Sequence, residues 1–362
     1  MKRLILLTTM ICAIVSFVAL LPQLLIAGDN GYRFNQQKSG CYDNYGKGTN
    51  RGYNDGWINR EQRMGECSDL KNNTLNGFLL EKANLVGADL SNADWRGCIL
   101  DGANFRNAKL VSITLGRLGN PSMPPPPASL KNTGLRNAVL INANLQNVNF
   151  ENAFLENARL NNAQMSGAKL MGAKLMGADL SHAMLFTADF TGARLSNAIL
   201  DDAKVSQAVM ANSNCTGARM KRVYLKFSKA PRAKFDKAVM SWAKVSSMDL
   251  EGASFKDTNL YKADMSYGNA EGATFRNAKM KYGKFVSTIF RRANLMNSDL
   301  YGANLQKANF YQSYLQNADL RHADLSETIL SEARLQGAKF DATTKLPFSR
   351  KKAKNLGMVF VE

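Results

Sequence analysis

A strict five-residue period runs through the chain from Leu130 to Phe340. Every fifth position is nearly always Leu, Phe or Met, and the residue two positions before it is usually Ala. The exceptions among the large positions are Val205, Cys215, Ala230, Val245 and Ala270. A period of five fits neither an amphipathic helix nor the alternation of a strand, so the sequence predicts a repeat architecture.

Each unit of this period has a simple solution in three dimensions. In an extended segment, residues two apart point to the same side, so the Ala and the large residue of a unit can share one interior. The residue two positions after the large one is mostly Asn or Gly, as at Asn137 and Gly172, and both types tolerate turns. Four such sides make one square coil, residues 20 apart stack, and the coils pair in parallel about 4.8 Å apart.

Units such as Ala178–His182 (Ala-Asp-Leu-Ser-His) and Ala293–Asn297 (Ala-Asn-Leu-Met-Asn) resemble the motif of the pentapeptide-repeat family. The resemblance covers about Leu70 to Phe340. It implies an all-β fold, a right-handed quadrilateral parallel β-helix with N- and C-terminal caps. Some members of the family imitate DNA and inhibit topoisomerases by means of a strongly negative rod. This chain has a net charge of +18, which argues against that mechanism here.

The N-terminal segment, residues 1–27, is typical of a secretory signal peptide, with two basic residues, a long apolar run and a small residue before Gly28. The length of the apolar run also allows an uncleaved membrane anchor over residues 4–27. In either case we expect the rod to be exported, either periplasmic or secreted. Residues 28–68 leave the period and carry Cys41 and Cys67, which we expect to form a disulfide in a cap over the first coil.

The remaining boundaries follow from the phase of the repeat. Residues 69–115 make the first coils, and residues 130–342 make the main solenoid. Residues 116–129 interrupt them with a Pro-rich loop that holds Pro124–Pro127. This loop is either a stiff arm that docks a partner or a protrusion that shields an edge.

The C-terminal segment, residues 343–362, also leaves the period and is expected to cap the last coil. Ser349 is a suitable N-cap for a short helix through Leu356, and Gly357 would stop that helix. The apolar residues Met358–Val361 would then form a terminal strand. The oligomeric state stays open.

Side chains that could perform catalysis are sparse and scattered. The two histidines, His182 and His322, are 140 residues apart, which places them in different coils. Cys98 and Cys215 replace core residues of the repeat and are expected to be buried, unreactive thiols. No phosphate loop, paired-Cys zinc motif or nucleophile elbow is present in the sequence. We therefore expect no enzymatic activity and no cofactor.

The strongest functional indication is positive charge interleaved with aromatic residues. The net charge of +18 and the pI near 9.7 suit an anionic partner, although they would also simply keep a rod soluble. Stacking in steps of 20 places alternating cations and rings in two adjacent columns, which we expect to lie on one flat side. This candidate binding face comprises Lys221, Arg222, Trp242, Tyr261, Lys262, Lys281, Tyr282, Tyr301, Arg321 and His322.

Two interpretations of this face remain open. It binds a ligand by ring stacking and charge, or its side chains only stabilise the ladder. The segment from Arg219 to Lys244 is rich in basic residues and weak in the repeat pattern, so a bulge that projects cations is expected there.

The sequence therefore favours a non-enzymatic, exported binding or scaffold rod in a bacterial envelope. We expect it to contact an acidic protein or an anionic polymer such as a glycan, a cell-wall polymer or lipopolysaccharide. The alternatives are a nucleic-acid-binding protein and a secreted effector that docks a host protein.

Overall fold

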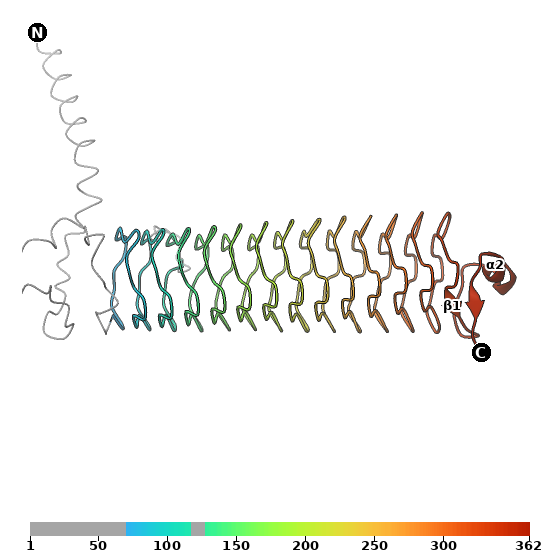
Figure 1. Cartoon of the computed structure of the whole chain (residues 1–362), viewed down its shortest axis with the longest axis horizontal. Coiled ribbons are helices and arrows are strands. Elements are labelled where there is room, and N and C mark those ends of the chain that lie inside the picture. The colour runs from blue at the N-terminus through green and yellow to red at the C-terminus, as the bar shows by residue number, and fades with distance from the viewer. Residues whose placement is uncertain (1–69, 117–126) are drawn as a thin grey trace, which may run out of the picture.

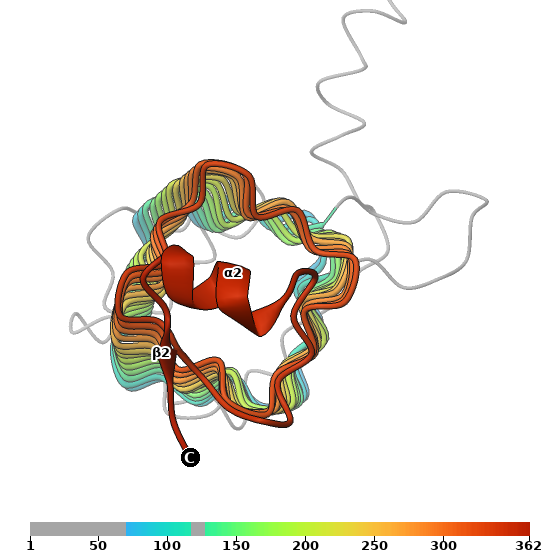
Figure 2. The same ribbon diagram turned by 90° about the vertical axis from the view of Figure 1, so that its right-hand side faces the viewer.

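The computed structural model describes residues 70–116 and 127–362, which form one straight rod closed at its C-terminal end (Figure 1). The rod is built from single-residue parallel bridges between coils, and these bridges join residues 20 apart over most of its length, as in Lys204↔Tyr224. Seen along its axis, the coil has a four-sided outline (Figure 2). The predicted stacking of residues 20 apart is therefore correct.

The interior contains the two residue types that the period predicts. The small residue and the large residue of each unit are almost all fully buried, for example Ala138 and Leu140. Aromatic rings stack along the axis inside the rod, with centroids 4.9 Å apart for Phe235 and Phe255 and 4.7 Å apart for Phe255 and Phe275. The core is thus one continuous column of side chains that touch the coil above and the coil below.

The corners are two-residue turns that immediately follow each large residue. The second turn residue has a positive φ along the rod, and Asn and Gly are common there, as at Asn137 (φ 57°) and Gly172 (φ 65°). Its backbone N–H donates to a carbonyl of the next coil, as Asn137 N does to Glu156 O at 3.0 Å. Each corner is therefore fixed to its neighbour by backbone hydrogen bonds.

The interruption ends earlier than the sequence analysis predicted. Ala128 is buried and Ser129 pairs with both Ile99 and Asn149, so the coil has already resumed at Ala128 rather than at Leu130. Partners across the interruption are 30 residues apart instead of 20, and the four sides stay in register. Gly116 is required where the chain leaves the coil, because a Cβ atom there would lie 2.3 Å from the backbone nitrogen of Gln146.

The C-terminal end is closed by a helix and a short strand pair. Strand β1 (Lys339–Phe340) pairs in parallel with β2 (Val359–Phe360), and helix α2 (Arg350–Asn355) lies between them in the chain and across the end of the rod (Figure 2). The Ser349 side chain accepts a hydrogen bond from Lys352 N, as expected for an N-cap. Ala353 and Met358 are buried against the last coil. This arrangement covers the apolar end of the core.

The bulge expected between Arg219 and Lys244 is absent. Bridges such as Arg219↔Val239 and Tyr224↔Lys244 continue the regular ladder through this segment. Val223 and Ala230 fill inward positions with no exposed surface. Smaller side chains are accommodated there without displacing the backbone, so the basic residues of this segment project from an unbroken coil.

Within the described ranges, no helix has the length and apolar character needed to cross a membrane. Residues 1–27, the Cys41–Cys67 pair and most of the Pro-rich loop lie outside those ranges.

Candidate binding surface

The predicted binding residues lie along one corner of the rod and not on a flat side. They occupy the two turn positions that follow a large residue in successive coils. Backbone hydrogen bonds hold these turns in register, for example Trp242 N to Tyr261 O at 2.8 Å and Tyr282 N to Tyr301 O at 2.9 Å. We call this surface the aromatic corner; it comprises the turn pairs 221–222, 241–242, 261–262, 281–282, 301–302 and 321–322.

Rings of the aromatic corner form a continuous edge-to-face ladder. Ring centroids are 6.0 Å apart for Trp242 and Tyr261, 6.0 Å for Tyr261 and Tyr282, and 5.7 Å for Tyr282 and Tyr301. The three interplanar angles are 80°, 89° and 84°. His322 extends the ladder, with its ring centroid 4.6 Å from that of Tyr301. The structure therefore brings together the aromatic residues that the sequence analysis selected.

Cations of the same corner lie over these rings. The Lys262 ammonium group lies 4.4 Å from the centroid of Trp242 and 5.4 Å from that of Tyr261. The Tyr301 ring has Lys281 at 5.5 Å and Arg321 at 5.7 Å. Such contacts stabilise by about 0.5–1 kcal/mol each at exposed sites. Part of the predicted face is therefore internal ladder packing.

Backbone strain accompanies two of the rings. Trp242 (φ 62°) and Tyr282 (φ 56°) lie in the left-handed region that favours Gly and Asn. Their side chains nevertheless remain 50% and 46% exposed, respectively. The corner therefore carries large rings where smaller residues would suit the turn better.

Both guanidinium groups of the corner are paired with carboxylates. Arg222 donates to both carboxylate oxygens of Asp202 at 2.7 and 2.6 Å. This contact raises the pKa of Arg222 and lowers the pKa of Asp202. Arg321 binds Asp319 in the same bidentate manner at 2.9 and 2.7 Å.

The Arg321–Asp319 contact shifts the two pKa values in opposite directions, as the Arg222–Asp202 contact does. Hydrogen bonding to Asp319 raises the pKa of Arg321. Burial raises the pKa of Asp319, but the hydrogen bonds from Arg321 outweigh it and the pKa lies below its usual value. Lys221 and Lys262, by contrast, form no ion pair within the described part of the chain. These two lysines are the cations most available to a ligand.

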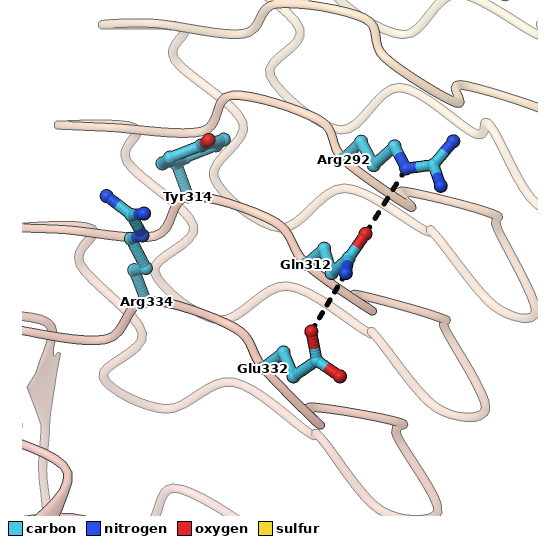
Figure 3. A pocket seen from close by; sticks show the side chains of 5 residues that line it. All are labelled: Arg292, Gln312, Tyr314, Glu332 and Arg334. Carbon is cyan, nitrogen blue, oxygen red and sulfur yellow. Dashed lines mark hydrogen bonds between the residues drawn. The ribbon is translucent and has the colours of Figure 1, made fainter.

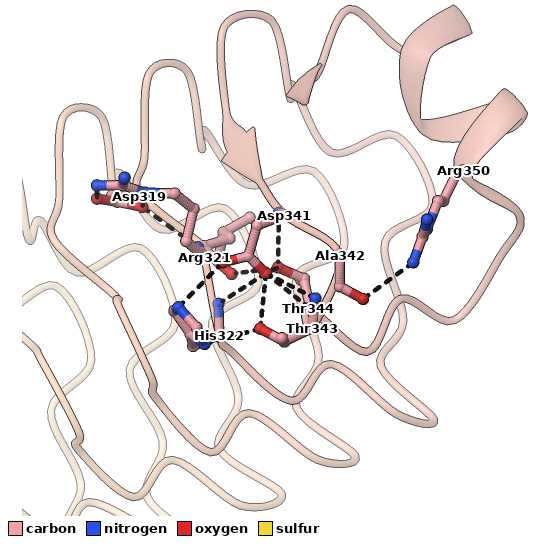
Figure 4. Close-up of polar contacts among 9 residues, drawn as sticks. Asp319, Arg321, His322, Asp341, Ala342, Thr343, Thr344 and Arg350 are labelled. Carbon is pink, nitrogen blue, oxygen red and sulfur yellow. Dashed lines mark hydrogen bonds and ion pairs between the residues drawn. The ribbon is translucent and has the colours of Figure 1, made fainter. Parts of the chain in front are cut away.

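His322 connects the aromatic corner to the C-terminal cap (Figure 4). Its Nε2 lies 3.3 Å from Asp341 Oδ2, and its Nδ1 lies 2.7 Å from the Thr343 hydroxyl. Asp341 Oδ1 also accepts hydrogen bonds from the backbone N–H groups of Thr343 and Thr344. Burial raises the pKa of Asp341, but hydrogen bonds from the Thr343 and Thr344 hydroxyls and from the backbone N–H groups of His322 and Thr343 outweigh it and lower the pKa to about 2. The cluster holds the last turn and supports no separate chemistry.

A shallow hollow of about 390 Å³ lies on another part of the surface (Figure 3). Its polar groups largely satisfy one another, because Arg292 Nε donates to Gln312 Oε1 at 3.2 Å and Gln312 Nε2 donates to Glu332 Oε2 at 2.8 Å. Arg334 lies 5.0 Å from the centroid of Tyr314. This side-chain ladder is consistent with a structural role.

In the described part of the chain, groups suited to catalysis do not converge. Cys98 and Cys215 are buried, and burial raises the pKa of each thiol to about 12, so neither is a thiolate near neutral pH. Among the described residues, no group of three His, Cys, Asp or Glu side chains could hold a metal ion.

Two strongly exposed aromatic residues were not predicted from the sequence as part of a binding surface. Phe227 and Tyr267 occupy turn positions on the next corner along the chain, with φ values of 60° and 63°. A large aromatic residue where the repeat prefers Asn or Gly is a signal that could have identified them.

The sequence pattern of pentapeptide repeats decides the family. It matches eight stretches, several of which overlap, and these cover most of the chain: residues 69–116, 128–157, 138–177, 155–192, 188–226, 238–277, 275–312 and 308–344. The chain belongs to the pentapeptide-repeat family. Proteins of this family fold as right-handed quadrilateral β-helices, which confirms the predicted fold class, and they are generally non-enzymatic structural or binding proteins.

Several solved structures are similar to this pentapeptide-repeat protein. HetL from Nostoc sp. PCC 7120, a protein involved in heterocyst differentiation regulation, is 27% identical over 74% of this chain and 89% of its own, with a TM-score of 0.32. Rfr23 from Cyanothece 51142 is 28% identical over 36% of this chain and 90% of its own, with a TM-score of 0.20. QnrB1, a plasmid-mediated fluoroquinolone resistance protein, is 16% identical over 68% and 93%, with a TM-score of 0.30. None of the curated proteins matches the chain in sequence.

Proposed function

We propose that this pentapeptide-repeat protein is an exported, non-enzymatic binding or scaffold rod of a bacterial envelope. It holds an anionic polymer, such as a glycan, a cell-wall polymer or lipopolysaccharide, along its aromatic corner. The apolar pattern of residues 1–27 and the net charge of +18 support export and an anionic partner. An acidic protein is the alternative partner for the same surface.

The aromatic corner carries this proposal. Every coil between Lys221 and His322 carries a ring or a cation at this corner, so a linear polymer aligned with the rod would meet rings and cations repeatedly. Lys221 and Lys262 are exposed, and their ammonium groups form no ion pair with a carboxylate in the described ranges. Exposed rings such as Trp242 and Tyr282 offer apolar area between these charges. Repeated weak contacts of this kind add up to useful avidity.

The test is salt-dependent retention of the full chain on a panel of immobilised polyanions: a sulfated glycan, lipopolysaccharide, a cell-wall polymer and DNA. The double variant Lys221→Gln with Lys262→Gln should elute at distinctly lower salt from the polymer that the wild type holds best. The matched control is Lys109→Gln with Lys169→Gln, which removes the same charge from elsewhere on the rod and should elute like the wild type.

Equal elution of the two double variants would show that charge acts without regard to position and would remove the aromatic corner from the proposal. Preferential retention on DNA would favour a nucleic-acid-binding protein. Export is tested separately, by locating the protein in the envelope, the spent medium or the cytoplasm of the producing cell.

A further inference from the structure

Phe227 and Tyr267 are exposed without any internal reason for exposure. Their side chains are 61% and 66% exposed, the highest values for large apolar residues in the described part of the chain. Neither ring has an aromatic or cationic partner among residues 70–116 and 127–362. On the aromatic corner, by contrast, Trp242 packs on Tyr261 and under Lys262. Ladder packing therefore explains the rings of the aromatic corner and does not explain these two.

Backbone strain sharpens this contrast. Phe227 and Tyr267 both have positive φ, a conformation that is unfavourable for bulky residues. Polar residues such as Gln207, Ser247 and Ser287 occupy the same turn position in neighbouring coils. A strained, exposed and internally unsupported ring indicates a contact made outside the molecule.

Lysines surround the two rings. Five lysines occupy this turn or the bridged columns on either side of it, and none of them forms an ion pair within the described residues: Lys204, Lys226, Lys229, Lys244 and Lys284. Lys226 and Lys244 lie 5.4 and 5.8 Å from the centroid of the Tyr224 ring, which holds them on the face beside Phe227. Asp249 and Asp264 are the acids among these columns, so the surface keeps an excess of positive charge.

The spacing of the rings is fixed by the coil. Lys229↔Asp249 and Asp249↔Asn269 pair in succession, which places Phe227 and Tyr267 two coils apart with Ser247 between them. Two coils measure about 9.6 Å at the parallel-strand spacing of about 4.8 Å. In an extended β-1,4-linked glycan every second sugar ring presents the same face, so its disaccharide repeat has a similar length.

We propose that this surface, the Phe227–Tyr267 corner, binds an acidic glycan with an extended β-1,4-linked backbone. Alternate sugar rings pack their C–H faces on Phe227 and Tyr267, and the carboxylate or sulfate groups of the glycan pair with the surrounding lysines. The inference rests on the proposed function, because it assumes an anionic polymer as the ligand, and it adds a second binding surface on the next corner of the rod. Single-stranded nucleic acid also stacks on aromatic rings, but stacked bases repeat at much shorter intervals than two coils.

The test compares two polyanions on the full chain. Alginate rich in β-1,4-linked mannuronate supplies acidic sugar rings, and polyaspartate supplies carboxylates without rings. The double variant Phe227→Asn with Tyr267→Asn places a residue suited to positive φ at both turns and leaves every charge in place. The control Gln207→Asn with Ser287→Asn changes the same turn position in neighbouring coils.

The double variant should bind alginate at least about tenfold more weakly than the wild type, since one stacking contact contributes on the order of 1–3 kcal/mol. Its binding to polyaspartate should be unchanged, and the control should behave as the wild type with both polymers. Unchanged alginate binding by the double variant would overturn this inference and leave the proposed function standing. Loss of binding to single-stranded DNA, with no retention on alginate, would assign the rings to nucleic acid instead. Failure of the wild type to bind any polyanion would overturn both proposals.

Discussion

Lys262 and Trp242 are in direct contact across two neighbouring coils, with the ammonium nitrogen 4.4 Å from the centroid of the indole ring. The same ammonium group lies 5.4 Å from the centroid of Tyr261. One lysine therefore bridges two successive rings of the aromatic corner.

Removal of this charge should weaken the ladder. Lys262→Met keeps most of the aliphatic stem and loses both cation–π contacts, so the free energy of unfolding should fall by about 1 kcal/mol. Urea denaturation followed by circular dichroism measures this change. Lys256→Met is the control, because Lys256 is exposed and lies over no ring; an equal loss in both variants would contradict the role of the rings.

Asparagine at the strained turns should have opposite effects on the two corners. Phe227→Asn and Tyr267→Asn relieve positive-φ strain and sacrifice no ring contact, so each should stabilise the rod by up to about 1 kcal/mol. Trp242→Asn relieves the same strain but removes a ring pair and a cation–π contact, so it should be neutral or destabilising. Urea midpoints for the three variants test the difference, and a destabilised Phe227→Asn variant would reveal an internal role for that ring.

Burial should determine how much an aromatic ring contributes to the free energy of unfolding. Phe255→Ala opens a cavity between the stacked rings of Phe235 and Phe275, and we expect a loss of about 3–5 kcal/mol. Phe227→Ala removes the same side chain from an exposed corner and should cost far less. Similar losses in the two variants, measured by urea denaturation, would be incompatible with the described core.

The C-terminal cap should loosen in acid. The pKa of Asp341 is about 2 in the folded protein, below the usual value of about 3.9. A depressed carboxyl pKa stabilises the fold above the unfolded pKa, and this contribution is lost as pH falls through the folded pKa. Hydrogen exchange in residues 343–362, corrected for intrinsic rates, should therefore accelerate between about pH 4 and pH 2. In Asp341→Asn the cap should exchange faster at neutral pH and lose this acid dependence.

The two described thiols, those of Cys98 and Cys215, should not react with a thiol reagent in the native protein. Burial raises the pKa of Cys98 and Cys215 to about 12, so both should resist a thiol reagent at pH 8 and react once the coil is unfolded in urea. The variants Cys98→Ala and Cys215→Ala distinguish them from the remaining cysteines. Fast native labelling at either position would contradict its burial.

The sequence was sufficient to predict the coil because one short rule is repeated in nearly every unit. Ala138 and Leu140 lie inside, Asn137 takes positive φ, and residues 20 apart pair in parallel, all as the period requires. The helix after Ser349 was also accessible, since its cap and its glycine stop are local signals.

The errors came from features that the period does not determine. The predicted binding residues lie on a corner because the turn uses both residues that follow the large one. The flat side holds only the bridged residue between two inward ones. The expected bulge is absent because Ala230 is accommodated, fully buried, in an inward position of a coil whose bridges stay regular. Phe227 and Tyr267 could have been found as aromatic residues at turn positions that prefer Asn or Gly, but only ring contacts in space show that these two rings are unsupported.

The interruption after Gly116 has a consequence for the orientation of each corner about the rod axis. If residues 117–126 were wound into the coil as two further sides, every column beyond them would be rotated by half a turn about the axis. Because Ile99 pairs directly with Ser129, each corner instead keeps the same orientation about the axis on both sides of the interruption. Deletion of five residues from the coil would rotate all later columns by a quarter turn about the axis. Deletion of 20 residues would shorten the rod by about 4.8 Å and leave the orientation of the later columns unchanged.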